Sequence, residues 1–119
     1  MVPSRFVTPP AGTFLAEVRD SAIRFPPPIR EFCDANNWTL FRVLTIDDHC
    51  LEIQPVLPDE ESDMTTGYHS SLSPDSRLWI PAPLRALVAL GDQSAMMRIE
   101  NGAIRIYLRQ VFETLGFRP

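Results

Sequence analysis

The basic residues of this chain are all arginines: the 119-residue sequence holds eleven arginines and no lysine. A guanidinium group offers paired N–H donors, which suit phosphate oxygens and the O6 and N7 atoms of guanine. The arginines are spread unevenly. Residues 69–119 hold six arginines against four acids, whereas residues 12–57 hold four against seven. The local charge of the second half therefore favours DNA, although the base composition of a genome explains the missing lysine equally well.

The charge of the whole chain argues against a nucleic-acid partner. It is −4 at pH 7, and affinity for nucleic acid comes largely from counterions that basic residues release from the phosphates. Four of the acids lie close together in a stretch with little to bury: Asp59, Glu60, Glu61 and Asp63. We interpret this stretch as an exposed linker rather than as a cation site.

No set of residues typical of an enzyme stands out. The two histidines and two cysteines lack the close-paired spacing of a structural zinc site: His49, His69, Cys33 and Cys50. The sequence has no glycine-rich phosphate loop. We therefore expect a protein that is not an enzyme, with no catalytic residues, no metal and no cofactor. The cysteines are expected to be reduced residues of the core.

One stretch of the chain occurs twice. Residues 20–30, DSAIRFPPPIR, are repeated as DSRLWIPAPLR at residues 75–85, an offset of 55. The Asp, the Ser, the two outer prolines and the closing Arg are identical, and three apolar positions match in kind. Further along, residues 50–53 match residues 103–106 with an offset of 53. An internal repeat of this size indicates two copies of one supersecondary unit.

Each copy is expected to fold as β-β-α-β-β. Apolar spacing and proline positions predict helices at residues 27–35 and 82–89. Residues rich in β-branched and aromatic side chains predict strands at 13–18, 22–25, 38–46, 50–54, 68–72, 77–80, 94–100 and 103–108. The Asn101-Gly102 dipeptide predicts a hairpin turn, and a short closing helix is expected at 109–115.

The predicted domain organisation follows from these elements. Residues 1–12 form a flexible arm, 13–57 the first copy, 58–67 the acidic linker and 68–119 the second copy. Each copy alone is too small for a stable core, so the two are expected to share one. The predicted fold is mixed α/β and mainly β: two ββαββ units interleaved in a small β-barrel, with the short helices outside.

The second copy carries a resemblance to a known family. Residues 76–85, SRLWIPAPLR, resemble the Gly-Arg-x-x-Ile-Pro-x-x-Leu-Arg signature of the AbrB/MazE/MraZ superfamily, the SpoVT-AbrB domain of microbial transcription factors and antitoxins. Two tandem copies resemble the arrangement in MraZ, which implies a pseudo-twofold, swapped-hairpin barrel. The chain departs from the signature at the glycine position, which is Ser76 and Ser21, and at the first arginine of the first copy, which is Ala22. Ser73 stands where MraZ has an aspartate.

The resemblance also implies a set of DNA-binding residues, because such proteins contact phosphates and bases through arginines at strand edges and near the helix. The arginines at these positions are Arg77 and Arg85 in the second copy, and Arg24 and Arg30 in the first. Arg98 and Arg105, on neighbouring strands, add positive charge.

Each of these arginines has a structural alternative. Arg30 and Arg85 are solvated, or they pair with two aspartates, Asp20 and Asp75, which in turn have the alternative of accepting backbone N–H groups in a turn. Arg105 alternates with apolar neighbours, which favours a plain surface role. Trp79 lies in a predicted strand, where it fills the core or packs on a partner.

The residues and the resemblance together predict a DNA-binding transcriptional regulator that acts as a homo-oligomer on double-stranded DNA. The alternative is a protein–protein interaction module, or an antitoxin-like binder of a protein partner, that kept the barrel and lost DNA binding. The sequence shows no apolar run typical of a signal peptide or of a membrane span. We therefore expect a cytoplasmic protein without membrane contact.

Overall fold

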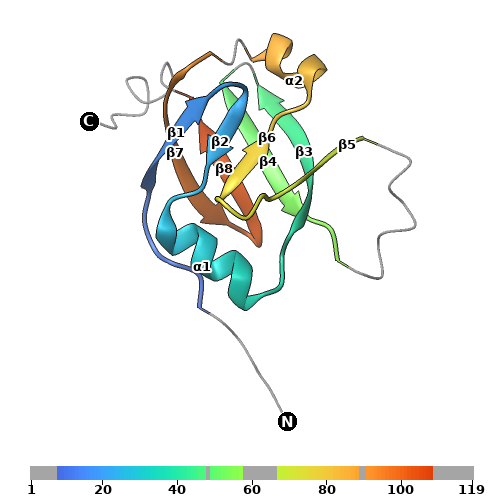
Figure 1. Ribbon diagram of the computed structural model, residues 1–119. Coiled ribbons are helices and arrows are strands. Elements are labelled where there is room, and N and C mark those ends of the chain that lie inside the picture. Colours follow the sequence, from blue (N-terminus) through green and yellow to red (C-terminus); the bar gives the residue numbers. More distant parts are fainter. Residues whose placement is uncertain (1–7, 48, 58–66, 89–90, 109–119) are drawn as a thin grey trace.

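The structure is a computed structural model that describes residues 8–47, 49–57, 67–88 and 91–108. Within these residues it is a small, mainly β protein with eight strands and two short helices (Figure 1). The helices are α1 (Pro27–Ala35) and α2 (Ala82–Leu87). The strands are β1 (Phe14–Arg19), β2 (Ala22–Arg24), β3 (Leu40–Asp47), β4 (Cys50–Pro55), β5 (Tyr68–Ser71), β6 (Arg77–Trp79), β7 (Gln93–Glu100) and β8 (Ala103–Tyr107). The predicted order β-β-α-β-β is confirmed in both halves.

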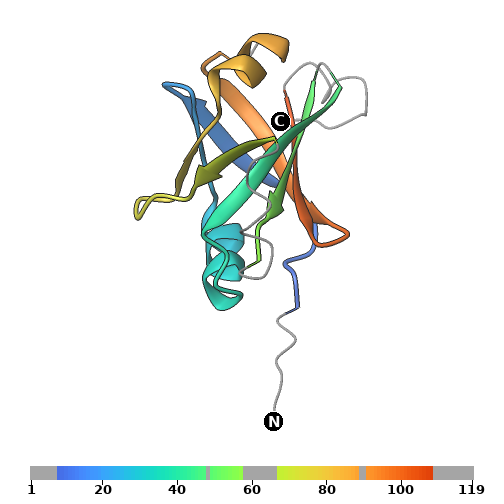
Figure 2. The same ribbon diagram turned by 90° about the vertical axis from the view of Figure 1, so that its right-hand side faces the viewer.

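The strands form one antiparallel sheet that curves into a nearly closed barrel (Figures 1 and 2). Their order is β5-β3-β4-β8-β7-β1-β2-β6, and the two outer strands of this order meet through a bridge between Leu72 and Leu78. Strands of the two halves pair directly: β1 with β7, β3 with β5, β4 with β8 and β2 with β6. Each half therefore completes the sheet of the other.

The interior of the barrel holds one cluster of buried apolar side chains drawn from both halves. Side chains alternate between the two faces of a strand, so in β3 Phe41 and Val43 point into the core while Arg42 and Leu44 are half-buried. The ring of Phe41 is fully buried and meets the ring of Phe25 edge to face, with 6.0 Å between ring centroids. This pair joins β3 to the segment that follows β2 within the buried cluster.

The two helices lie at opposite ends of the barrel (Figure 1). Each helix begins with prolines, whose missing N–H costs nothing in the first turn. Helix α1 is followed by a left-handed residue, Asn37, and the next N–H, that of Trp38, bonds to the carbonyl of Cys33 at 2.9 Å. Because Trp38 belongs to this helix-ending turn, β3 begins at Leu40, and the predicted strand start at residue 38 is wrong.

Some sequence predictions lie outside the described residues. These are the closing helix at 109–115, residues 58–66 of the acidic linker and residues 1–7 of the arm. Of the last two residues of the second predicted helix, Val88 follows the end of α2 at Leu87, and Ala89 lies outside the described residues. The hairpin turn is confirmed, since Asn101 and Gly102 both have positive φ angles, of 53° and 77°.

Matching turns precede β2 and β6. Ser21 and Ser76 each have a φ of 69°, in the left-handed region that favours glycine. Their carbonyl groups accept hydrogen bonds across the halves: Ser76 from the N–H of Phe25 at 2.8 Å, and Ser21 from the N–H of Ile80 at 3.0 Å. The two turns thus hold the short β2–β6 pair in register.

We expect the substitution Ser76→Gly to raise the free energy of unfolding by about 0.5 kcal/mol, because a left-handed conformation costs a non-glycine residue about 1–2 kcal/mol and glycine's extra chain entropy offsets only part of this. Ser76→Val should lower the same quantity by about 1 kcal/mol or more, since a β-branched residue fits this conformation worst. Urea unfolding of the three proteins measures both changes. A glycine variant less stable than the parent would contradict the assignment.

Candidate functional site

The outward surface of β1, β2 and β6 brings arginines of both halves together. In the antiparallel register Arg24 lies directly opposite Arg77 on one side and opposite Glu17 on the other. The next row on this side joins Arg19, Ala22 and Trp79 in the same way, and its middle residue, Ala22, is only 2% exposed. The row between them, Val18, Ile23 and Leu78, points inward and is at most 1% exposed. We call the outward residues Glu17, Arg19, Arg24, Arg77 and Trp79 the arginine face.

Arg77 is held in a defined orientation. Its Nε donates a hydrogen bond to Asp75 Oδ2 at 2.8 Å, and its guanidinium lies 5.1 Å from the centre of the Trp79 ring. Asp75 also accepts a hydrogen bond from the hydroxyl of Ser73, whose oxygen in turn accepts the backbone N–H of Arg77 at 2.9 Å. The hydrogen bond from Ser73, followed by that from Arg77, lowers the pKa of Asp75 below its usual value. The loop thus fixes both the carboxylate and the guanidinium.

Arg24 and Arg19 are less constrained. Arg24 is exposed and has no ion pair among the described residues. Arg19 pairs with Glu17 at 3.7 Å, but both side chains are more than half exposed, and such surface pairs contribute little. Both guanidinium groups are therefore accessible to a partner.

A shallow hollow of about 140 Å³ lies within this face. Its walls include Arg19, Arg24 and Arg77, together with Glu17, Asp20 and Ala22. A pocket for a drug-sized molecule has a volume of about 300–1,000 Å³. The hollow is smaller than this, so the face suits contact with an extended surface better than enclosure of a small molecule.

Arg30 and Arg85 lie on the helices rather than on this face. Arg30 donates from Nη1 to the carbonyl of Ser73 at 2.7 Å and from Nε to Asp34 Oδ1 at 3.0 Å. It thereby ties α1 to the loop that positions Arg77. Arg85 is half-buried, and within the described residues it has no ion pair.

The predicted ion pairs with Asp20 and Asp75 are therefore wrong. The carboxylate partner of Arg30 is Asp34, one helical turn away, and the basic partner of Asp75 is Arg77 rather than Arg85. Residues four apart on a helix lie side by side, so Asp34 is within reach of Arg30. The tight turn before β6 places Asp75 beside Arg77.

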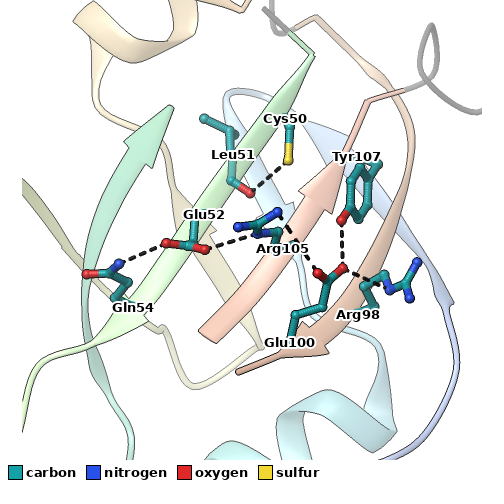
Figure 3. A network of polar contacts seen from close by, with 8 residues as sticks. All are labelled: Cys50, Leu51, Glu52, Gln54, Arg98, Glu100, Arg105 and Tyr107. Carbon is teal, nitrogen blue, oxygen red and sulfur yellow. Dashed lines mark hydrogen bonds and ion pairs between the residues drawn. The ribbon is translucent and has the colours of Figure 1, made fainter. Parts of the chain in front are cut away.

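Arg98 and Arg105 lie on β7 and β8, outside the arginine face, and β7 is the neighbour of β1 in the sheet. Figure 3 shows the polar network that holds them. Arg105 Nε binds Glu52 Oε2 at 3.0 Å, and Arg98 Nε binds Glu100 Oε2 at 3.0 Å. Tyr107 donates its hydroxyl to Glu100 at 2.6 Å. This side of the barrel is therefore locally neutral.

The polar network also shifts the pKa values of two of its members, Arg105 and Tyr107. The hydrogen bond to Glu52 raises the pKa of Arg105, so its charge is permanent. Burial first, and then the bond to Glu100, raises the pKa of Tyr107 above 10.0. Hydrogen bonds within the network contribute to both shifts, and the network also pairs each of its two arginines with a carboxylate.

The structure thus divides the six predicted arginines. Arg24 and Arg77 are brought together, Arg30 supports them through the Ser73 loop, and the remaining three lie elsewhere: Arg85, Arg98 and Arg105. Arg19 was missed by the sequence reasoning. The signal for it was present, because Arg19 alternates with the apolar Val18 and lies just before the turn into β2.

The cysteines carry no accessible nucleophile. Cys33 and Cys50 are 0% and 3% exposed and are not disulfide-bonded. Burial, aided by the charge of Asp34, raises the pKa of the Cys33 thiol to about 12. Burial, aided by Asp47, raises that of Cys50 to about 11. The reactive species is the thiolate, so both groups are held in their inert form.

We expect a thiol reagent at pH 8 to modify neither cysteine of the folded protein within minutes, and to modify two per chain in denaturant. At that pH the thiolate fraction of either group is about one in a thousand or less. Both folded pKa values lie above the unfolded value of about 8.5, so stability from this source falls as the pH rises beyond 8.5. Rapid native labelling of one thiol would contradict this burial.

Among the described residues, no group of three His, Cys, Asp or Glu side chains is placed to hold a metal ion. The helices in this part of the chain are also far shorter than the span of a bilayer. No protein-family model matches the sequence, and no curated protein matches it. The assignment to the AbrB/MazE/MraZ superfamily accordingly stays a prediction that rests on the residues of the motif.

Proposed function

We propose that this protein is a DNA-binding transcriptional regulator of the AbrB/MraZ type, and that its arginine face contacts double-stranded DNA. The observation that carries the proposal is the meeting of Arg24 and Arg77, which come from strands 53 residues apart in the sequence and lie directly opposite each other on an exposed surface. Like charges directly opposite in a sheet destabilise it. An anionic partner such as a phosphate backbone supplies the compensating charge.

The fold supports the same assignment. In the proposed swapped-hairpin arrangement each half supplies strands to the other, which agrees with the pairing of β1 with β7 and of β3 with β5. The family signature has a glycine where this chain has Ser21 and Ser76, and both serines adopt the left-handed conformation that glycine favours. The left-handed φ at both serines is the conformation that a glycine at these two positions would also favour, which supports the proposal.

Selection from a random-sequence duplex pool at about 50 mM salt, followed by a salt titration of the enriched duplex, tests the proposal. Each phosphate contact contributes about −0.9 to the slope of log K against log salt. Contacts from Arg19, Arg24 and Arg77 predict a slope of about −3, and Arg19→Ala should reduce its magnitude by about one. A pool without enrichment and without salt-sensitive binding would refute the proposal.

A second candidate, a protein-interaction module, is favoured by Trp79. Its side chain is 44% exposed and Arg77 lies over its ring, and Trp and Arg are the residue types most enriched at interface hot spots. If the partner is a protein, the carboxylates of Glu17 and Asp75 belong to the recognised surface, whereas they would repel the phosphates of DNA. The substitution Glu17→Arg separates the two, because it strengthens binding to a duplex and disrupts a protein interface matched to a carboxylate.

A further inference from the structure

The ion pair between Asp75 and Arg77 is fixed from several sides. Arg77 and Trp79 are two residues apart on β6, so their side chains lie on the same face of the sheet. The guanidinium lies 5.1 Å from the centre of the indole ring, and its Nε donates to Asp75 Oδ2 at 2.8 Å. Arg77 is therefore held between a carboxylate and an aromatic ring.

The loop before β6 holds the carboxylate in turn. Asp75 Oδ1 accepts the hydroxyl of Ser73, and the carbonyl of Ser73 accepts a hydrogen bond from Arg30 Nη1 at 2.7 Å. Both oxygens of Asp75 are thus engaged. Within the part of the chain that the structure describes, Asp75 is the only carboxylate partner of Arg77, and its bond comes from Nε. This arrangement leaves the two Nη groups of Arg77 as donors for a partner.

The carboxylate changes what Arg77 binds best. It cancels much of the positive charge that attracts a guanidinium to phosphate, because the paired atoms are only 2.8 Å apart. The hydrogen-bonding capacity of the Nη groups is kept. A pair of uncharged acceptors is therefore favoured over an anion, and the O6 and N7 atoms of guanine in the major groove are such a pair.

Arg19 and Arg24 are held less firmly. The side chain of Arg19 is 70% exposed, and its ion pair with Glu17 is long, at 3.7 Å. Arg24 has no ion pair among the described residues. Both keep the charge and the freedom of orientation that suit phosphate contacts, which position a protein on DNA without reading its sequence.

We propose that Asp75 is a specificity-determining residue: by pairing with Arg77 it directs this arginine to the edge of one guanine, while Arg19 and Arg24 contact phosphates. Asp75 acts through Arg77 and does not itself touch the DNA. The role is not part of the family signature, in which the aspartate stands at the position of Ser73. This inference rests on the proposed function and names the base that the arginine face recognises.

Replacing single guanines of the selected duplex by 7-deazaguanine tests the contact, because this analogue lacks the N7 acceptor and still pairs with cytosine. We expect one such replacement to weaken binding of the parent protein about tenfold. The same replacement should weaken binding of Arg77→Lys less than twofold, since lysine offers a point charge without a planar fork. The salt slope of about −3 holds if all three arginines contact phosphates; with Arg77 on a base it is about −2.

Asp75→Asn tests the positioning role. Glu17→Gln is the matched control, since it removes the same charge from a carboxylate that pairs with Arg19 rather than with Arg77. The control should raise the affinities for the selected duplex and for an unrelated duplex alike. Asp75→Asn should raise the affinity for the unrelated duplex and lower that for the selected one, so that their ratio falls about fivefold or more.

The unfolding midpoint of each variant is compared with that of the parent. If Asp75→Asn does not fold, the comparison of the parent with Arg77→Lys decides alone. Equal effects of every 7-deazaguanine on these two proteins, or a parallel response of both duplexes to Asp75→Asn, would overturn the inference and leave DNA binding intact. Absence of binding to any duplex would overturn the inference together with the proposed function.

Discussion

Replacing Arg24 by alanine is expected to weaken binding of the selected duplex about tenfold, which corresponds to about 1.4 kcal/mol. Arg24 is exposed, has no ion pair among the described residues, and lies opposite Arg77 at the centre of the arginine face. Its removal should leave the free energy of unfolding within about 0.5 kcal/mol of the parent, because the lost attraction to Glu17 and the relieved repulsion from Arg77 oppose each other. Binding titrations and urea unfolding measure the two quantities.

Arg98→Ala is the matched control for this experiment. Arg98 is half-buried and pairs with Glu100 on β7, outside the arginine face. We expect its removal to change DNA affinity by less than twofold at moderate salt, because its charge is already paired with Glu100 and the remaining field is screened by salt. Equal losses for the two variants would show that net charge, and not the arginine face, determines binding.

Replacing Phe41 by alanine is expected to lower the free energy of unfolding by about 3–5 kcal/mol. Phe41 is fully buried, and its ring contacts Phe25 edge to face, so the change removes both the burial of the ring and an aromatic contact. Small domains are stable by only about 5–15 kcal/mol. We therefore expect a large fall in the denaturant midpoint, measured by circular dichroism or tryptophan fluorescence.

Leu44→Ala is the control in the same strand. Leu44 is three residues further along β3 and is only half-buried, opposite Glu52. Its truncation should cost less than half as much as that of Phe41, because less apolar surface is returned to water. A loss as large for Leu44 as for Phe41 would mean that the inward and outward faces of β3 are wrongly assigned.

Local sequence signals predicted the order of the elements well. Prolines mark the starts of both helices, the Asn101-Gly102 dipeptide marks the hairpin, and alternation identifies the strands. These sequence signals were weakest where a residue lies between two elements and packs on one of them. Trp38 has the composition of a strand residue, yet its backbone closes the turn after α1 and its ring packs on Phe32 at 5.1 Å. Tertiary packing overrides propensity at such positions.

The site was less predictable, because it depends on which strands pair and in what register. Nothing near Arg24 in the sequence indicates that Arg77 lies beside it, since β2 and β6 meet only in the folded sheet. The neutralisation of Arg105 by Glu52 depends on the β4–β8 register in the same way. By contrast, the pairing of Arg30 with Asp34 follows from helical spacing alone and was open to prediction.

The ion pair between Glu52 and Arg105 also affects which hairpins pair with each other, the first being β3–β4 and the second β7–β8. The offset of 53 that aligns the hairpins matches these two residues in sequence, and the β4–β8 register sets them face to face. Two copies of the first hairpin paired in this way would oppose glutamate with glutamate, and two copies of the second would oppose arginine with arginine. Like charges directly opposite are unfavourable. The ion pair therefore favours pairing of the first hairpin with the second and disfavours pairing of either hairpin with a copy of itself.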